Sequence, residues 1–168
     1  MIKKILLAIM IALPMCAVAQ TKIGVISADS VFQVMPETAQ AQIQLQEKSK
    51  MYDGEIKKLQ EELQKKYTEY QALENDATTP ASIKERRVQE IQELDTKYQQ
   101  FIQTAERDIQ MQQQQLLAPI REKIMIAIKA VGKENGFTAI LPEGVAIYTG
   151  DDIIDVTPLV KAKLGLSK

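Results

Sequence analysis

Apolar residues recur every three or four positions along two long stretches of the chain, with polar residues between them. The first stretch carries Ile56, Leu59, Leu63, Tyr70 and Leu73, and the second carries Ile91, Leu94, Tyr98, Phe101 and Ala105. The polar segment 75–82 separates the two stretches. Heptad spacing places an apolar seam along one side of a helix, and a short connection folds two such helices against each other. The pattern predicts a long antiparallel helical hairpin over 37–118 with its tip at 75–82.

The register of this hairpin follows from pairing residues whose numbers sum to 153 or 154. Leu59 then meets Leu94, and Tyr52 meets Phe101. The same arithmetic places Pro36 near Pro119. Because proline disrupts a helix interior and is tolerated in the first turn, both prolines are predicted to mark the root of the hairpin. At 1.5 Å per residue the arm is about 60 Å long, so it must project from any core.

Some details of the hairpin are less regular. Near the tip the pairing sets Lys66 against Arg87 and Tyr70 against Lys84. The second helix begins either with Thr79 as its N-cap before Pro80 or one turn later with Ser82 and Glu85 as a capping box.

Gly54 lies inside the first helix. The favoured interpretation is that the missing side chain makes room for an aromatic ring, and the alternative is a flexible point in the arm.

The remaining segments predict a small head over 20–36 and 119–168. A β-branched run, 22–28, predicts a strand, followed by a short helical piece at 31–35. An amphipathic helix is expected after Pro119, with Gly136 at its C-cap. Two strands, 137–141 and 145–149, are expected to form a hairpin around the turn 142–144. Thr157 and Pro158 are expected to open a last helix, 158–164. The fold class is therefore α+β, mainly α, with a coiled-coil arm on a β-rich head.

The N-terminus carries the order of a secretory signal peptide. Met1-Ile-Lys-Lys4 is followed by an apolar run too short to span a bilayer, and then by Ala17-Val-Ala19. The protein is therefore predicted to be exported, with cleavage of the signal peptide after Ala19. Removal of residues 1–19 leaves 149 residues, takes away the one cysteine, and lowers the formal net charge from −1 to −3 because Lys3 and Lys4 are lost.

Composition argues against several function classes. The chain has no histidine and no phosphate-binding loop, so no catalytic constellation or nucleotide cycle is indicated and no cofactor is expected. An acidic mature chain does not favour a nucleic-acid partner. Three aspartates, at 151, 152 and 155, lack the alternating pattern of a calcium loop, so a turn before a helix is the interpretation and no metal site is expected.

The order of these elements resembles the Skp/OmpH family of periplasmic chaperones. The resemblance covers almost the whole mature chain, and its segments are Lys22-Ile-Gly-Val-Ile-Ser27, Pro36-Glu37, Pro119-Ile120, Asn135-Gly-Phe-Thr-Ala-Ile-Leu141, Val145-Ala-Ile-Tyr148 and Asp155-Val-Thr-Pro-Leu-Val160. It implies a homotrimer in which the small sheets join into a body and three arms surround a cavity. It also implies ATP-independent binding of unfolded outer-membrane proteins in the periplasm.

The resemblance implies a set of subunit-joining residues, whereas client contact in the family is spread over the inner arm surfaces with no compact site to carry over. The residues expected to join the subunits are Ile23, Val25, Ile140, Val145 and Ile147. Family members often have basic arms, whereas this chain is acidic, so uncharged arm residues must contribute more to client contact. The candidate client-binding residues on the arm are Met51, Tyr67, Tyr70, Ile102 and Met111, each with the alternative of a structural place beside the seam.

The basic cluster Lys84, Arg86 and Arg87 beside the tip has two interpretations. The simpler one is a solvated helix face balanced by Glu85 and Glu90. The functional one is a contact for an acidic client or, at the membrane periphery, for acidic lipid headgroups.

Exposed strand edges in so small a head also predict self-association. The competing function for the whole chain is a structural coiled-coil scaffold or spacer of the cell envelope.

Overall fold

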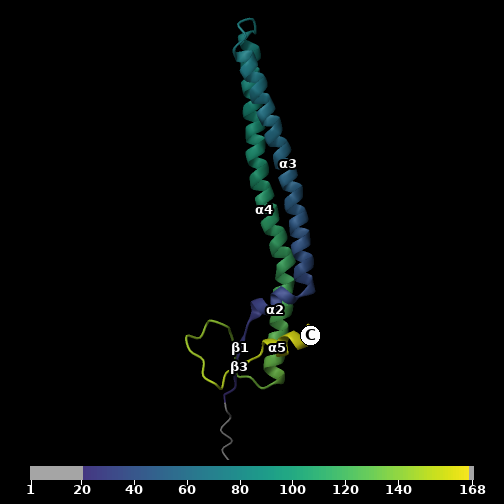
Figure 1. The fold of residues 1–168 in the computed structure, drawn as a ribbon, viewed down its shortest axis with the longest axis vertical. Coiled ribbons are helices and arrows are strands. Elements are labelled where there is room, and N and C mark those ends of the chain that lie inside the picture. Colours follow the sequence, from purple (N-terminus) through teal and green to yellow (C-terminus); the bar gives the residue numbers. More distant parts are fainter. Residues whose placement is uncertain (1–20, 167–168) are drawn as a thin grey trace, which may run out of the picture.

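The computed structural model describes residues 21–166 and has a long paired-helix arm with a small head at one end (Figure 1). The elements are β1 (Ile23–Ile26), α2 (Ala28–Val34), α3 (Pro36–Glu74), α4 (Ala81–Glu134), β2 (Ala139–Pro142), β3 (Ile154–Asp155) and α5 (Thr157–Lys163). The predicted signal peptide and its cleavage site lie outside the described residues. The predicted fold class, mainly α with a small β cluster, is confirmed.

Helices α3 and α4 pack side by side along the arm (Figure 1). The rings of Tyr52 and Phe101 meet edge to face with centroids 5.8 Å apart, as the predicted register requires. Ile91, Leu94 and Ala105 are the buried residues of α4 along this seam. Short-range apolar contacts therefore hold the two helices together over a narrow stripe, and most other arm positions face solvent.

The tip turn depends on one carboxylate. Asp76 Oδ1 accepts hydrogen bonds from the backbone N and the hydroxyl of Thr78 at 2.8 and 2.7 Å, and Asp76 Oδ2 accepts one from the Thr79 hydroxyl at 2.8 Å. Both predicted N-caps for α4 are therefore wrong. The Thr79 hydroxyl is occupied by Asp76, the cap position is Pro80, and Ser82 already lies inside the helix.

Helix α4 runs through Pro119 without ending, so the prediction of a separate helix after Pro119 is wrong. An interior proline removes one helix hydrogen bond at a cost of about 3 kcal/mol. Burial of Ile120, Ile124, Ala127 and Val131 just beyond it offsets that cost. The root of the arm nevertheless lies here, because Lys123 of α4 forms an ion pair with Glu37 in the first turn of α3.

The head contains a three-stranded parallel sheet in the order β2-β1-β3. β1 is central: Ile23 pairs with Ala139 on one side, and Gly24 pairs with Ile154 on the other. The predicted hairpin of 137–141 with 145–149 is wrong. Residues 143–153 contain no strand, β2 pairs in parallel with β1, and 143–153 form the long loop that connects the parallel strands β2 and β3.

The head core lies between the sheet and the helices α2, α4 and α5. Its buried residues include Ile26, Val31, Met35, Val156 and Val160.

Two predictions of helix starts in the head need correction. α2 begins at Ala28 with Ser27 as its cap, three residues before the predicted start at Val31. Thr157 is the first residue of α5 rather than its N-cap, and its backbone N donates to Asp155 Oδ1 at 2.8 Å.

Gly54 lies in open space, so the favoured prediction that it makes room for an aromatic ring is wrong. A Cβ atom built at Gly54 would have no neighbour within 4 Å. A glycine inside a helix costs about 1 kcal/mol relative to alanine because the unfolded chain gains conformational freedom. The alternative, a flexible point in the arm, stays a prediction.

We expect Gly54→Ala to stabilise the arm by about 1 kcal/mol, because nothing in the fold opposes the added methyl group. Urea unfolding followed by circular dichroism at 222 nm measures the difference in unfolding free energy. An equal or lower stability of the variant would show that the arm needs the glycine for a conformation that alanine resists.

Candidate functional site

The basic cluster at the tip makes bonds within the arm. Lys84 Nζ donates to the backbone oxygens of Glu74 and Asp76 at 3.1 and 3.0 Å. A cation at the C-terminal end of a helix satisfies free carbonyl groups and interacts well with the helix dipole. Lys84 therefore holds the end of α3, and the predicted contact of Lys84 with Tyr70 gives way to this capping role.

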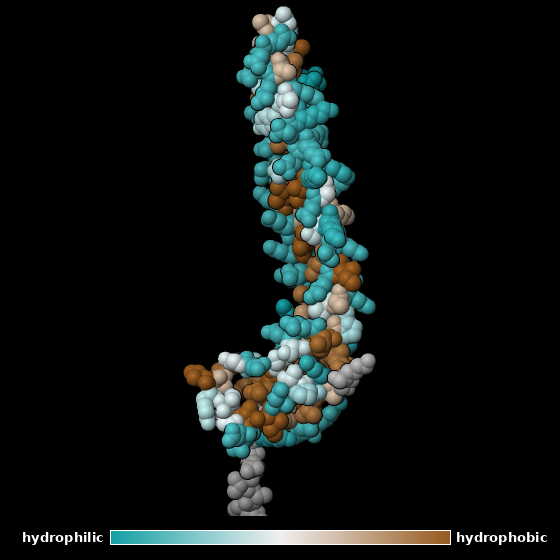
Figure 2. All heavy atoms as spheres, viewed as in Figure 1, coloured by the Kyte–Doolittle hydropathy of each residue, from teal (hydrophilic) through white to brown (hydrophobic). Residues whose placement is uncertain are grey.

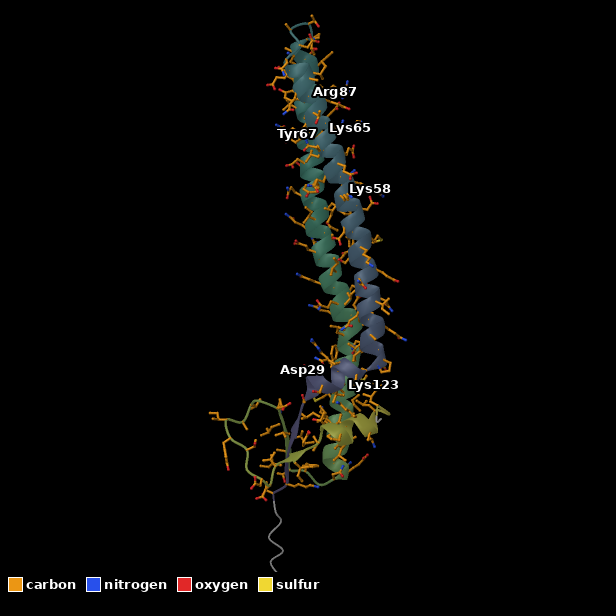
Figure 3. The ribbon with its side chains drawn as sticks, in the orientation of Figure 1. Asp29, Lys58, Lys65, Tyr67, Arg87 and Lys123 are labelled. Atoms are coloured by element: carbon orange, nitrogen blue, oxygen red, sulfur yellow. The ribbon has the colours of Figure 1, made fainter. Side chains whose placement is uncertain are left out.

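Arg86 and Arg87 share one acceptor, the carboxylate of Glu90. Arg86 Nε lies 3.3 Å from Glu90 Oε1, and Arg87 Nη1 lies 2.7 Å from Glu90 Oε2. Lys66 of the opposite helix reaches the same Oε2 at 3.1 Å. Lys66 and Arg87 thus face each other as predicted, with the Glu90 carboxylate between them. This ion group joins α3 to α4 at a polar layer of the seam. Figure 3 places Arg87 and Tyr67 in this upper part of the arm.

The hydrogen bonds from Arg87 and then Lys66 lower the pKa of Glu90 from 4.5 to about 2. A lowered pKa in the folded protein stabilises the fold above the unfolded pKa, and this contribution disappears as the pH falls toward the folded pKa. The ion group at Glu90 should therefore stabilise the arm at neutral pH and lose its effect between about pH 4.5 and pH 2.

We expect Glu90→Gln to lower the melting temperature at pH 7 and to lower it progressively less as the pH is reduced toward 2. Thermal unfolding followed by circular dichroism at several pH values measures this convergence. Glu93→Gln is the matched control, because Glu93 is exposed on the same helix and should change little at any pH. A constant difference between Glu90→Gln and the wild type would contradict the assignment.

The apolar candidates on the arm divide into two groups. Met51, Tyr67 and Met111 are exposed, with 57%, 45% and 47% of their surface accessible. Tyr70 and Ile102 are half-buried along the arm. The structure also exposes Ile43 and Ile83, which the sequence interpretation missed. Both residues lie off the heptad seam, and this position in the sequence is the feature that could have identified them as exposed.

These exposed side chains do not gather into one patch. The three side chains of α3 hold different positions relative to its seam. Met51 lies one residue before a seam position, Tyr67 lies one residue after a seam position, and Ile43 lies two residues before a seam position. The three side chains therefore project in different directions around the helix. Figure 2 shows an arm covered mainly by hydrophilic side chains, with separate apolar spots along it. The arm thus offers several small apolar contacts along its length.

The predicted assembly residues occupy both faces of the sheet and the loop beyond it. Gly24 and Ile26 of β1 are buried against the helices, so the alternating Ile23 and Val25 face the other side and stay half-buried. Ile140 is paired with Gly24 and packs against the head core, so it supports the protomer's own fold. Among the described residues 21–166, no strand covers the outer edges of β2 and β3.

The loop 143–153 exposes the other two predicted residues. Val145 and Ile147 are largely exposed, and Tyr148, which the sequence interpretation missed, is exposed beside them. The loop swings away from the helices (Figure 1), and Figure 2 shows an apolar patch at its outer edge. Three large apolar side chains on one loop make a surface that gains free energy when another chain covers it.

Residues 21–166 contain no helix that combines the length and apolar character needed to cross a bilayer. Within the same residues, no three Cys, Asp or Glu side chains come close enough together to hold a metal ion.

The model of the family described as "Outer membrane protein (OmpH-like)" matches residues 22–164. The chain belongs to the OmpH-like family. The match extends from β1 to the end of α5 and thus includes both arm and head. A search of curated proteins gives no significant match. At the level of the family, this membership supports a periplasmic chaperone of outer-membrane proteins rather than an enzyme.

Proposed function

We propose that this OmpH-like protein is an ATP-independent periplasmic holdase that binds unfolded outer-membrane proteins and prevents their aggregation. The observation that carries the proposal is the arm itself. It projects from the head as one pair of helices, and its exposed apolar side chains, Ile43, Met51, Tyr67, Ile83 and Met111, are spread along it. Scattered weak contacts suit a client that has no fixed shape.

Such a protein works by mass action. Binding the unfolded client lowers the concentration of the species that aggregates, and no chemical step is needed. Each contact is weak, but several contacts on one client raise the effective concentration of the remaining ones. The polar layer at Lys66, Arg87 and Glu90 keeps the arm paired while leaving its outer surface free for these contacts.

We further propose that three protomers assemble through their heads, so that three arms surround one client. The support is the half-buried outer sheet face at Ile23 and Val25 together with the exposed Val145, Ile147 and Tyr148. Assembly in the periplasm follows removal of the signal peptide after Ala19. Ile140 contributes to this surface indirectly, because its side chain packs within the protomer.

Charge attraction has a limited part in this proposal. The mature chain has a net charge of −3, and Lys84, Arg86 and Arg87 at the tip already bond to oxygens of the arm. Contact of the tip with acidic headgroups or acidic clients would have to compete with those bonds. Client capture should therefore depend only weakly on salt, because surface charge attraction is what salt screens.

The test is light scattering as a urea-unfolded outer-membrane β-barrel protein is diluted into buffer with and without the mature chaperone. We expect aggregation to be suppressed without nucleotide at about one oligomer per client. A matched coiled-coil protein without a head serves as the control. Unsuppressed aggregation, with the oligomer intact by its solution mass, would favour the competing function of a structural coiled-coil spacer of the envelope.

A further inference from the structure

The charged residues of the arm are distributed unevenly along its length. Segments 47–74 and 81–108, the outer part of the arm, carry 24 charged residues among 56. Segments 38–46 and 109–120, next to the root, carry none among 21 and contain nine glutamines. We call these two segments the glutamine collar. Each segment belongs to a different helix, so the absence of charge arises twice in the sequence.

The two segments lie at the same level of the arm. One shallow hollow at the root is lined by Gln40, Ala41 and Gln44 from α3 and by Leu116, Pro119 and Ile120 from α4, with the charged Glu37 and Lys123 at its root-side end. Cross-helix polar contacts give the register of the two segments. Lys48 Nζ donates to Gln112 Oε1 at 3.4 Å, so the tip-side end of 109–120 lies opposite charged residues of α3, and Glu37 pairs with Lys123 on the root side. The charge-free segments therefore overlap next to the root, where 38–46 lies opposite the later part of 109–120.

The collar presents unused amide groups beside apolar side chains. Eight of its nine glutamines are exposed, and Gln112 is the one whose side chain hydrogen-bonds within residues 21–166. Ile43 and Met111 are exposed among them, at 56% and 47%. A purely solvated helix face has no reason to lack charge on two helices at once, since Lys and Glu are equally good helix formers and more soluble.

We propose that the glutamine collar binds an extended segment of the unfolded client polypeptide, a proposal that rests on the holdase function. A glutamine amide both donates and accepts hydrogen bonds, which matches the N–H and C=O groups of an extended backbone. Uncharged amides lose less free energy than charged groups on leaving water. At 1.5 Å per residue the two segments are about 14 and 18 Å long, the length of an extended chain of about five residues.

The composition of the collar fits a binder that does not select for client charge. Backbone groups are common to every client, and the flexible Met111 adapts to different side chains. A chain with a net negative charge gains from this arrangement, because the collar neither attracts nor repels acidic segments. The segment bound at the root lies beside the head.

The experiment compares two quadruple variants with matched chemistry. The collar variant replaces Gln40, Gln44, Gln110 and Gln114 with alanine, and the control variant replaces the exposed Gln60, Gln64, Gln92 and Gln99 in the charged outer arm. Alanine favours helix, so both variants should keep their helical circular dichroism. The probe is a dye-labelled, urea-unfolded outer-membrane β-barrel protein whose binding is followed by fluorescence anisotropy at 50 and 500 mM NaCl.

We expect the collar variant to bind the probe about tenfold more weakly at both salt concentrations and the control variant to bind as the wild type does. Unchanged affinity of the collar variant, with wild-type binding intact, overturns the collar proposal and leaves the holdase function standing. An altered solution mass of the collar variant also overturns it, because the collar would then be a contact between copies of the chain. No binding of the probe by the wild type refutes the holdase function and the collar proposal together.

Discussion

Replacing Ile147 with glutamate should reduce the solution mass of the mature protein to that of a single chain. Ile147 is fully exposed on the loop 143–153 of the protomer, so the protomer's own fold does not use its side chain. If the heads assemble through this loop, each copy buries an isoleucine worth about 1.5–3 kcal/mol, and a buried carboxylate reverses that gain. Three symmetric copies would multiply the loss.

Light scattering coupled to size exclusion measures this mass, and circular dichroism tests whether the helices persist. Ile83→Glu is the matched control, since Ile83 is an exposed isoleucine near the arm tip and should leave the mass unchanged. Ile140→Glu would not be informative, because Ile140 packs against the protomer's core and its replacement would disturb the fold itself. An unaltered mass for Ile147→Glu would exclude this loop as the assembly surface.

Gly24→Ala should destabilise the head by about 2 kcal/mol, the cost typical of a side chain forced into a packed core. A Cβ atom at Gly24 would lie 2.8 Å from Val156 Cγ1 and 3.2 Å from the ring of Phe137. Val156 is fully buried, and Gly24 lies in the central strand with partners on both sides. Neither the strand nor its neighbour can move aside without losing sheet hydrogen bonds.

Urea denaturation at neutral pH measures the decrease in unfolding free energy. Circular dichroism reports unfolding of the arm, and a fluorescent probe attached to the head reports unfolding of the head separately. Gly150→Ala is the control, because a Cβ atom at Gly150 would meet nothing within 4 Å. Wild-type stability for Gly24→Ala would mean that Phe137 and Val156 pack less tightly against β1 than their distances indicate.

The sequence predicts the arm well because the helix period is a local property. The contact between Tyr52 and Phe101 follows from heptad spacing and one turn position. The start of α4 is less predictable, since Thr79 can cap a helix or bind Asp76, and only the folded turn decides between them. Continuation of α4 through Pro119 depends on burial of residues such as Ile124, which is a tertiary effect.

The sheet is harder to predict because strand pairing is non-local. Val145-Ala-Ile-Tyr148 has the composition of a strand but forms none, although the outer edge of β2 is unpaired among the described residues. Ile154 and Asp155 carry a weaker strand signal and still pair, because Val156 behind them anchors the segment in the core. Among the candidate site residues, Met51 and Met111 could lie at the surface or beside the seam from sequence alone, and the fold exposes both. The bonds made by Lys84 and Arg87 depend on the folded tip.

The central position of β1 determines the order in which the chain can fold. Its partners Ala139 and Ile154 lie more than a hundred residues further along, so the sheet has a very high contact order. Closing so long a loop in a disordered chain is slow and entropically costly. Once α3 and α4 have paired along their length, however, the two ends of the chain segment between β1 and its strand partners already lie near each other at the root. We therefore expect the arm to form first and to bring the C-terminal strands to β1, so that the head forms only after the segment 154–163 is available.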